Sequence, residues 1–263
     1  MTEDSRSMPH PAERFGSSPA AERRAGRMDT GAQRPTAHQL AYEFLRDRIL
    51  SGHYKPGVRL RAEHIAAEIG VSRMPVREAV LQLDAEGLLT TLPNRGVVVS
   101  RLTPEEVVEL FEIRAPLEGL ATRLAVEHAT EEALLDLDHC LARMRLAEGD
   151  HLLWIDRHDE LHDRICRLSH RDRLCQLARQ LRMQIQPYLR LFTSAHHSPE
   201  LTGFGHDVIL AALRARDADR AEAAMREHVM ANAQEIASFV REEQRLEGRI
   251  AGGRGARRAR RFE

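Results

Sequence analysis

The fold of the N-terminal part is decided by residues 69–83, which have the sequence IGVSRMPVREAVLQL. The apolar positions recur at the spacing of one helix face, and they are Val76, Ala79, Val80 and Leu83. Arg73 and Arg77 lie four residues apart on an adjacent face, and Ser72 is placed to cap the helix. The segment therefore predicts a helix that packs by one side, presents two arginines from another, and begins with N–H groups free to meet a phosphate.

The elements around this helix complete a small domain. Apolar periodicity predicts three helices, over residues 38–51, 62–69 and 73–86. Gly70-Val71-Ser72 separates the last two, and two β-rich runs, 88–92 and 97–100, flank the hairpin signal Pro93-Asn94-Arg95-Gly96. This order of helix, helix, turn, helix and hairpin is typical of a winged helix-turn-helix, which places one helix in the major groove of DNA.

The polar residues of this domain are suited to DNA. Arginine makes the bidentate contact to guanine that is used most to read base edges, and Arg73 and Arg77 are the candidates. Arg95, at the hairpin tip, can lie along the minor groove or the phosphates. The alternative is that both helix arginines are only solvated, with Arg77 paired to Asp84 or Glu78. The order of the elements favours the DNA-reading interpretation.

The same residues carry a resemblance to a known family. Residues 39–100 resemble the winged-helix domain of the GntR family, through Tyr54-Lys55-Pro56-Gly57 and through the run from Ile69 to Ala79. The resemblance implies that DNA is contacted by Ser72, Arg73, Arg77 and, in the wing, Gly96. It also puts Arg61 near a further contact of the family.

Bulk composition limits the classes of protein that fit. The 263 residues are 42% hydrophobic, enough for two domains with cores, and the net charge of −1 excludes nucleic-acid binding by overall charge. The three cysteines form no CxxC pair, which indicates reduced thiols and a cytoplasmic protein rather than a disulfide framework. No stretch approaches 18 continuous apolar residues, so we expect no membrane contact.

Composition and periodicity divide the chain into four parts. Residues 1–36 are predicted to be a disordered tail, because they contain almost no large apolar side chain, and 37–102 form the winged helix-turn-helix. From 103 to 245 every segment has helical period, which predicts an all-α antiparallel bundle of six to seven helices. Residues 246–263 are predicted to be a basic tail. The fold class is therefore mainly α.

Four histidines fall on apolar helix faces of this predicted bundle. His158 and His162 lie one turn apart on one helix, and His206 and His228 lie on two others. Each one alone is more often a core histidine with a hydrogen-bond partner. Three helices that direct imidazoles inward instead favour a shared metal ion, to which Asp159 could add a carboxylate oxygen. Such a site suits Zn²⁺ best, with Ni²⁺ or Mn²⁺ as alternatives.

Arg114 lies on the apolar stripe of the long helix predicted after Thr103, between Phe111 and Leu117. It either pairs with Glu118, four residues on, or turns into the pocket to hold the carboxylate of an effector.

The second half also resembles a known domain. Residues 104–240 are similar to the FCD ligand-binding domain of the FadR-like branch of GntR regulators, through the motif from Glu112 to Glu118, His162 followed by Ser169, and His206 with His228. In metal-binding members, an aspartate four residues before the first histidine joins three histidines. The resemblance implies that His162, His206 and His228 are ligands here. The aspartate position holds His158 and Asp159 is shifted by one, so either could be the fourth ligand.

Together these features predict a function. We expect a homodimeric regulator, most often a repressor in this family, that binds a palindromic operator and responds to a small organic acid. One alternative is a metal-free C-terminal domain that binds an acyl-CoA-like ligand or only dimerises. A metal-dependent hydrolase is disfavoured, and no enzymatic activity is expected, because the sequence has no Gly-rich phosphate loop and no nucleophile motif.

Overall fold

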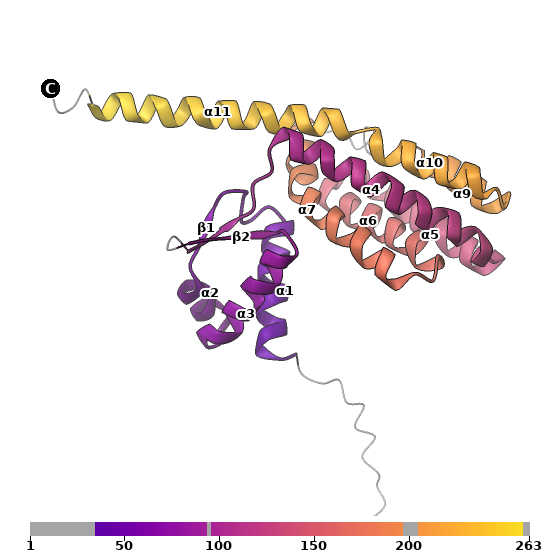
Figure 1. Cartoon of the computed structure of the whole chain (residues 1–263), viewed down its shortest axis with the longest axis horizontal. Helices are drawn as coiled ribbons and strands as arrows, with labels where there is room; N and C mark the ends of the chain where they lie inside the picture. The colour runs from indigo at the N-terminus through magenta and orange to yellow at the C-terminus, as the bar shows by residue number, and fades with distance from the viewer. Residues whose placement is uncertain (1–34, 94–95, 197–204, 260–263) are drawn as a thin grey trace, which may run out of the picture. The chain divides into compact units, whose positions relative to one another are not determined.

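The computed structural model describes residues 35–93, 96–196 and 205–259 (Figure 1). Helices dominate this part of the chain and a small sheet accompanies the first three of them, which confirms the mainly α fold class. The predicted disordered tail lies almost entirely outside the described residues, as does Arg95.

The N-terminal part is a winged helix-turn-helix. Its elements in chain order are α1 (Ala37–Leu50), β1 (Arg59–Leu60), α2 (Ala62–Ile69), α3 (Arg73–Ala85), β2 (Leu89–Leu92) and β3 (Gly96–Val99). The strands form one antiparallel sheet in the order β1-β3-β2, with Leu89 opposite Val99 and Arg59 opposite Val98. The β-runs of the wing were predicted, whereas β1 was not.

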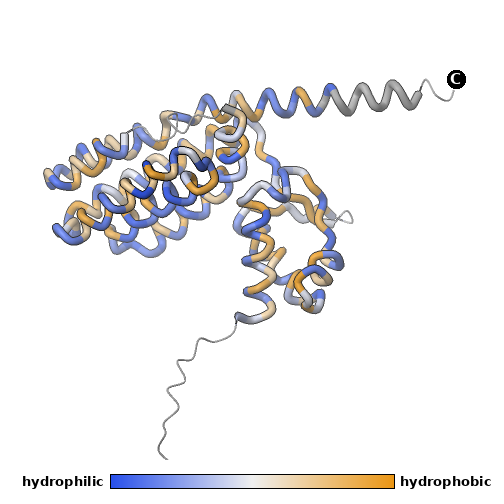
Figure 2. The backbone as a smooth tube through the Cα atoms, turned by 180° about the vertical axis from the view of Figure 1, so that it is seen from behind, coloured by the Kyte–Doolittle hydropathy of each residue, from blue (hydrophilic) through white to orange (hydrophobic). Residues whose placement is uncertain are grey.

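The core of this part is built from the predicted apolar face of α3. Val76, Ala79, Val80 and Leu83 are all buried, against Leu45 and other side chains of α1. Hydrophobic and hydrophilic residues alternate along these helices in the tube of Figure 2. The start of α1 is fixed by a capping box, in which Thr36 and Gln39 exchange backbone-to-side-chain hydrogen bonds.

The C-terminal part is helical throughout its described residues. Its elements are α4 (Pro104–Ala125), the short 3₁₀ helix η1 (Val126–His128), α5 (Glu131–Leu146), α6 (His151–Leu168), α7 (Asp172–His196), α9 (His206–Arg214), α10 (Ala218–Met230) and α11 (Ala233–Ala259). The run Thr103-Pro104-Glu105-Glu106 predicts a helix start, and the structure confirms it. Thr103 and Glu106 form a capping box ahead of α4, and Pro104 occupies its first turn. The core includes the fully buried Trp154 of α6.

The last predicted helix differs from the observed structure. Apolar periodicity predicts one helix over 218–245, but the chain forms α10 and α11, separated by a turn at Ala231-Asn232. Asparagine favours helix ends over helix interiors, because its amide competes for backbone hydrogen bonds. The α11 helix also continues to Ala259, through much of the segment predicted as a tail, although residues 246–259 contain four glycines, which disfavour a helix.

Helices α4 and α10 lie side by side (Figure 1) and approach each other closely at Gly119. A Cβ atom at this position would lie 2.6 Å from Cγ of Arg226 and 3.2 Å from the carbonyl oxygen of Glu222. Glycine therefore sets the spacing of this helix pair.

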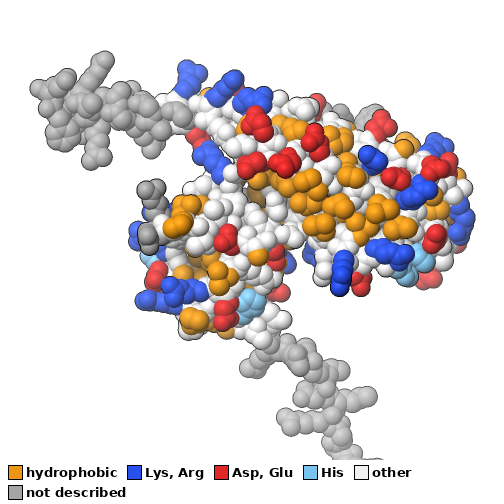
Figure 3. Space-filling view, viewed as in Figure 1, with side chains coloured by type: hydrophobic (Ala, Val, Ile, Leu, Met, Phe, Trp, Pro, Cys, Tyr) orange, Lys and Arg blue, Asp and Glu red, His pale blue; other side chains and the backbone are white. Residues whose placement is uncertain are grey.

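Figure 3 shows hydrophobic side chains gathered on the visible face of the helical part, in the region where Figure 1 draws α4. Ile113 and Leu120 of this helix are each 42% exposed. None of the helices among the described residues is long and apolar enough to span a bilayer.

Candidate metal centre and nucleic-acid interface

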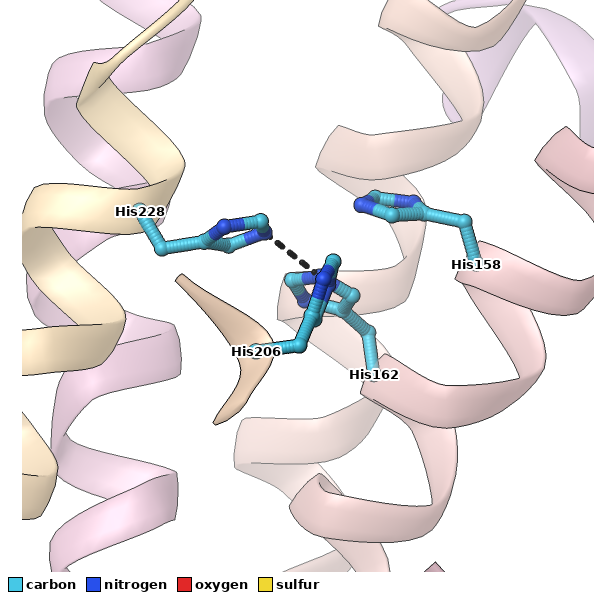
Figure 4. A group of neighbouring side chains, drawn as sticks. All are labelled: His158, His162, His206 and His228. Atoms are coloured by element: carbon cyan, nitrogen blue, oxygen red, sulfur yellow. Dashed lines mark hydrogen bonds between the residues drawn. The ribbon is translucent and has the colours of Figure 1, made fainter. Parts of the chain in front are cut away.

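Four buried histidines meet in the core of the helical part (Figure 4). His158 and His162 come from successive turns of α6, His206 is the first residue of α9, and His228 lies in the last turn of α10. Figure 4 shows the four rings turned toward one another from these three helices. The side-chain periodicity that placed them on apolar faces therefore brings all four to one point.

The distances between ring nitrogens fit a metal ion. Nε2 of His162 lies 3.1 Å from Nε2 of His228 and 3.4 Å from Nε2 of His206. One ligand atom from each histidine can be chosen so that all four lie within 4.8 Å of one another. Neighbouring ligands of a tetrahedral zinc ion with Zn–N bonds near 2.05 Å are separated by about 3.3 Å. The cluster is thus close to coordination spacing.

Gly205 positions the histidine of α9. It is the N-cap of that helix, with a φ of +97° that side-chain-bearing L-residues rarely adopt. A Cβ atom added there would lie 3.6 Å from Cβ and Nδ1 of His228. The left-handed backbone turns the chain into α9 so that His206 enters the centre beside His228.

The surroundings of His158 favour its neutral form. Burial, assisted by the neighbouring His162 and His228, holds the pKa of His158 well below its ordinary value. Nδ1 of His158 is buried and makes no hydrogen bond to any residue that the structure describes. A neutral imidazole has one ring nitrogen whose lone pair can bind a metal ion. The residues present therefore fit a first-row divalent cation.

A buried carboxylate orients His162 from behind. Oε2 of Glu118 lies 2.7 Å from Nδ1 of His162, while its other oxygen accepts a hydrogen bond from Nε of Arg114 at 3.0 Å. Nη1 of Arg182 donates to Glu118 at 3.2 Å. Burial opposes ionisation of Glu118, but the two guanidinium groups and His162 outweigh it and hold the pKa of the carboxyl well below its usual range. Glu118 thereby holds the Nδ1 proton of His162 and directs Nε2 into the centre.

Asp159 makes its hydrogen bond outside the histidine cluster, although its Oδ1 lies 3.8 Å from Nδ1 of His158. Its Oδ2 accepts a hydrogen bond from Nε2 of Gln186 at 2.5 Å, and its Oδ1 lies 3.9 Å from Nε of Arg182. Of the two candidates for the fourth ligand, the structure brings His158 together with the three other histidines and turns Asp159 toward α7.

Arg114 takes the first of the two roles that the sequence left open, and its contact with an effector carboxylate stays a prediction. It forms the pair with Glu118, and it also lines a cavity of about 30 Å³ together with His158, His228 and Gln186. Oε1 of Gln186 is buried without a hydrogen-bond partner among the described residues. Sequence reasoning missed Arg182. The residue could have been found because it lies at helical spacing between two buried apolar residues, Ala178 and Ile185, on the same face of α7.

The predicted DNA-contacting residues are exposed on the N-terminal part. Ser72 is the N-cap of α3, and its hydroxyl makes no capping hydrogen bond. The Arg73 side chain is 72% exposed, with Nη1 3.7 Å from a carboxylate oxygen of Glu63. Arg77 is exposed as well.

A single groove of about 820 Å³ joins several of these residues. It is lined by Arg61 at the start of α2, Arg77 of α3 and Gly96 at the start of β3. Gly96 has a φ of +82°, so the wing turns there through a conformation that favours glycine. Helix and wing therefore present one continuous concave surface that includes three arginines, Arg59, Arg61 and Arg77.

Comparison with known proteins agrees with this division. Residues 37–99 match the family described as bacterial regulatory proteins, gntR family, and residues 109–231 match the FCD domain. A Bacillus subtilis protein called uncharacterized HTH-type transcriptional regulator YdhC is 39% identical over 111 residues, which are 42% of this chain and half of that protein. The HTH-type transcriptional repressor RspR of Escherichia coli is 32% identical over 78% of this chain and 89% of its own length.

A solved structure shares the whole arrangement. Escherichia coli McbR/YncC superposes with a TM-score of 0.70 and 27% sequence identity, over 78% of this chain and 98% of that one. The similarity thus extends through both the winged helix-turn-helix and the helical part. The chain belongs to the GntR family of DNA-binding transcriptional regulators and carries an FCD domain.

Proposed function

We propose that this regulator is a homodimeric repressor, and that it releases a palindromic operator when a small organic acid binds beside a divalent metal ion in its FCD domain. The observation that carries the proposal is the convergence of four buried imidazoles at coordination spacing next to Arg114. A purely structural core has no need to bury four polar rings against one another, because each ring requires a partner.

The metal would be held by His158, His162, His206 and His228, with Zn²⁺ as the first choice and Ni²⁺ or Mn²⁺ as alternatives. Such an ion supplies a Lewis-acidic centre that attracts anionic oxygen ligands. Four neutral nitrogens leave its double positive charge uncompensated within the ligand set. Glu118 is the nearest anion, and Arg114 and Arg182 already neutralise it.

The uncompensated positive charge of a bound divalent ion indicates which chemical class of effector would bind. A carboxylate is the ligand that a divalent ion and a neighbouring guanidinium bind together, and Arg114 lines the cavity beside His158 and His228. A cavity of about 30 Å³ has room for water but not for an organic acid of several carbons. Binding must therefore move the side chains or helices that close the cavity, which supports a coupling between the effector and the fold.

The proposed DNA contacts lie on α3 and on the wing. Arg73 and Arg77 would contact base edges, Ser72 a phosphate, and Arg61 and Gly96 the flanking backbone, with Arg95 as a further contact outside the described residues. Four residues separate the end of β3 from the start of α4, so a shift of α4 acts on the wing through a short connection.

Repression and dimerisation have separate support. RspR is called a repressor, and it is similar to this chain over most of both lengths. The exposed Ile113 and Leu120 on α4 form an apolar face that a second copy would cover, and a two-fold dimer matches a palindromic operator. In this proposal the histidine centre senses an effector and does not catalyse a reaction, so we expect no hydrolase activity.

Operator binding by the full-length protein tests the proposal. Affinity is measured at fixed salt against a panel of metabolite carboxylates, with metal-loaded and metal-stripped protein. We expect one carboxylate to weaken operator binding several-fold to a hundredfold, only with metal present, and Arg114→Ala to abolish the response. A response to acyl-CoA that survives metal removal would instead support the metal-free alternative.

A further inference from the structure

Two cysteines lie against each other where α6 ends and α7 begins. Sγ of Cys166, in the last turn of α6, is 2.9 Å from Sγ of Cys175, in the first turns of α7. A disulfide bond is about 2.05 Å long, so the two sulfurs need to approach by less than about 1 Å to be joined. The third cysteine, Cys140, is buried on α5 and belongs to neither helix.

The surroundings hold this pair in place. The Cys175 thiol also lies 3.1 Å from the carbonyl oxygen of Cys166 and 3.8 Å from Oγ of Ser169. Ala121 and Ala178, both fully buried, pack against the pair. Small side chains and a short connection between α6 and α7 thus keep the sulfurs together, and nothing bulky separates them.

The two thiols differ in accessibility. Cys166 is buried, and burial, with Cys175 beside it, raises the pKa of its thiol far above the ordinary value. Cys175 is only partly buried, so it is the more accessible of the two residues. Only a small oxidant can reach such a half-buried pair, which points to a peroxide rather than to a bulky disulfide.

We propose that Cys166 and Cys175 are a site of reversible covalent oxidation, at which a peroxide joins them in an intramolecular disulfide. In the first step Cys175 sulfur attacks one oxygen of hydrogen peroxide, the O–O bond breaks, and water and a sulfenic acid form. In the second step Cys166 sulfur attacks the sulfur of that sulfenic acid, the S–O bond breaks, and a second water leaves. Two thiols lose two electrons to one peroxide, and a dithiol reductant restores them.

Peptide mapping of the full chain tests this assignment. Protein that has been reduced and desalted is treated with a small excess of hydrogen peroxide, alkylated and digested with trypsin. Arginines flank both cysteines, so Cys166 is released in Ile165–Arg167 and Cys175 in Leu174–Arg179. We expect these two peptides joined and lighter by two hydrogens, with the number of free thiols falling from the three in the sequence to Cys140 alone.

Controls separate the folded arrangement from general thiol reactivity. Cys140→Ala should leave the yield of linked peptide unchanged, and Cys166→Ala should leave Cys175 as a sulfenic acid that a sulfenic-acid trapping reagent labels. In denaturant the linked peptide should form more slowly and mix with links to Cys140. Three free thiols after peroxide, a link between two chains, or equal yields in folded and denatured protein would overturn the proposal.

Discussion

At the scale of single residues, the histidine centre is defined by which atoms face it. His158 and Asp159 are neighbours on one helix, yet a rotation of about 100° per residue sends their side chains in different directions. The ring of His158 faces the other three histidines, while Asp159 accepts a hydrogen bond from Gln186 of α7. Replacing each in turn therefore distinguishes a four-nitrogen site from one with a carboxylate.

We expect His158→Ala to weaken metal binding at least tenfold and Asp159→Ala to leave it nearly unchanged. The first variant removes a ligand, whereas the second removes a carboxylate that holds Gln186 and Arg182. Competition with a chromophoric chelator measures both affinities. Loss of metal from the aspartate variant alone would assign the fourth ligand to Asp159.

On the proposed DNA-binding surface, Arg77→Ala should weaken operator binding by about 1–3 kcal/mol, or roughly fivefold to 150-fold, and leave the melting temperature unchanged. Its side chain is exposed and lines the groove between α3 and the wing, so it contributes little to the core. Arg220→Ala is the matched control, because it removes an exposed arginine from α10 instead. Equal losses in the two variants would indicate an effect of net charge rather than base reading.

Sequence reasoning predicted the four histidines of the cluster better than the residues that surround them. Helical periodicity placed all four histidines and Arg114 on inward faces, because burial follows spacing along a helix. The contact of Glu118 with both His162 and Arg182 joins residues 44 and 64 positions apart, and no local pattern encodes such a pairing. The choice between His158 and Asp159 likewise depends on helix rotation in the packed core.

At the scale of secondary structure, the starts of helices are the features that the sequence predicts most reliably. Thr103 and Thr130 each accept a hydrogen bond from the backbone three residues on, as a capping hydroxyl does. The end of α10 has a weaker signal, since Asn232 favours a helix end but neither proline nor glycine marks the turn. The strand β1 has two residues and exists only through its pairing with β3, which lies far along the chain.

The close approach of α4 and α10 gives a stability prediction. Gly119→Val should lower the free energy of unfolding by about 1–3 kcal/mol, because its Cβ would meet Arg226 and the backbone of Glu222 and force the helices apart. Gly149→Ala is the control, since a Cβ there has no atom within 4 Å. Urea denaturation measures both. An unchanged midpoint for Gly119→Val would show that the helix pair separates at little cost.

At the scale of the whole molecule, a shared ion would tie three helices together. Removal of metal with a chelator should lower the melting temperature of the helical part by on the order of 10 °C, if the ion is present at about a thousand times its dissociation constant. Differential scanning calorimetry with and without chelator measures the shift. The His162→Ala variant should melt at the lower temperature from the outset and respond to neither chelator nor added metal.

The two histidines on α6 have a further consequence for the rate at which the protein folds and unfolds. His158 and His162 come together as soon as one turn of helix forms, whereas His206 and His228 are 44 and 66 residues away from His162. A metal ion can therefore be captured early by α6 and gain its remaining ligands only after the chain has closed two long loops. Most of the binding energy is then absent from the folding transition state. A bound ion would therefore slow unfolding far more than it would speed folding. The metal-bound protein would stay folded long after free metal has been removed from solution.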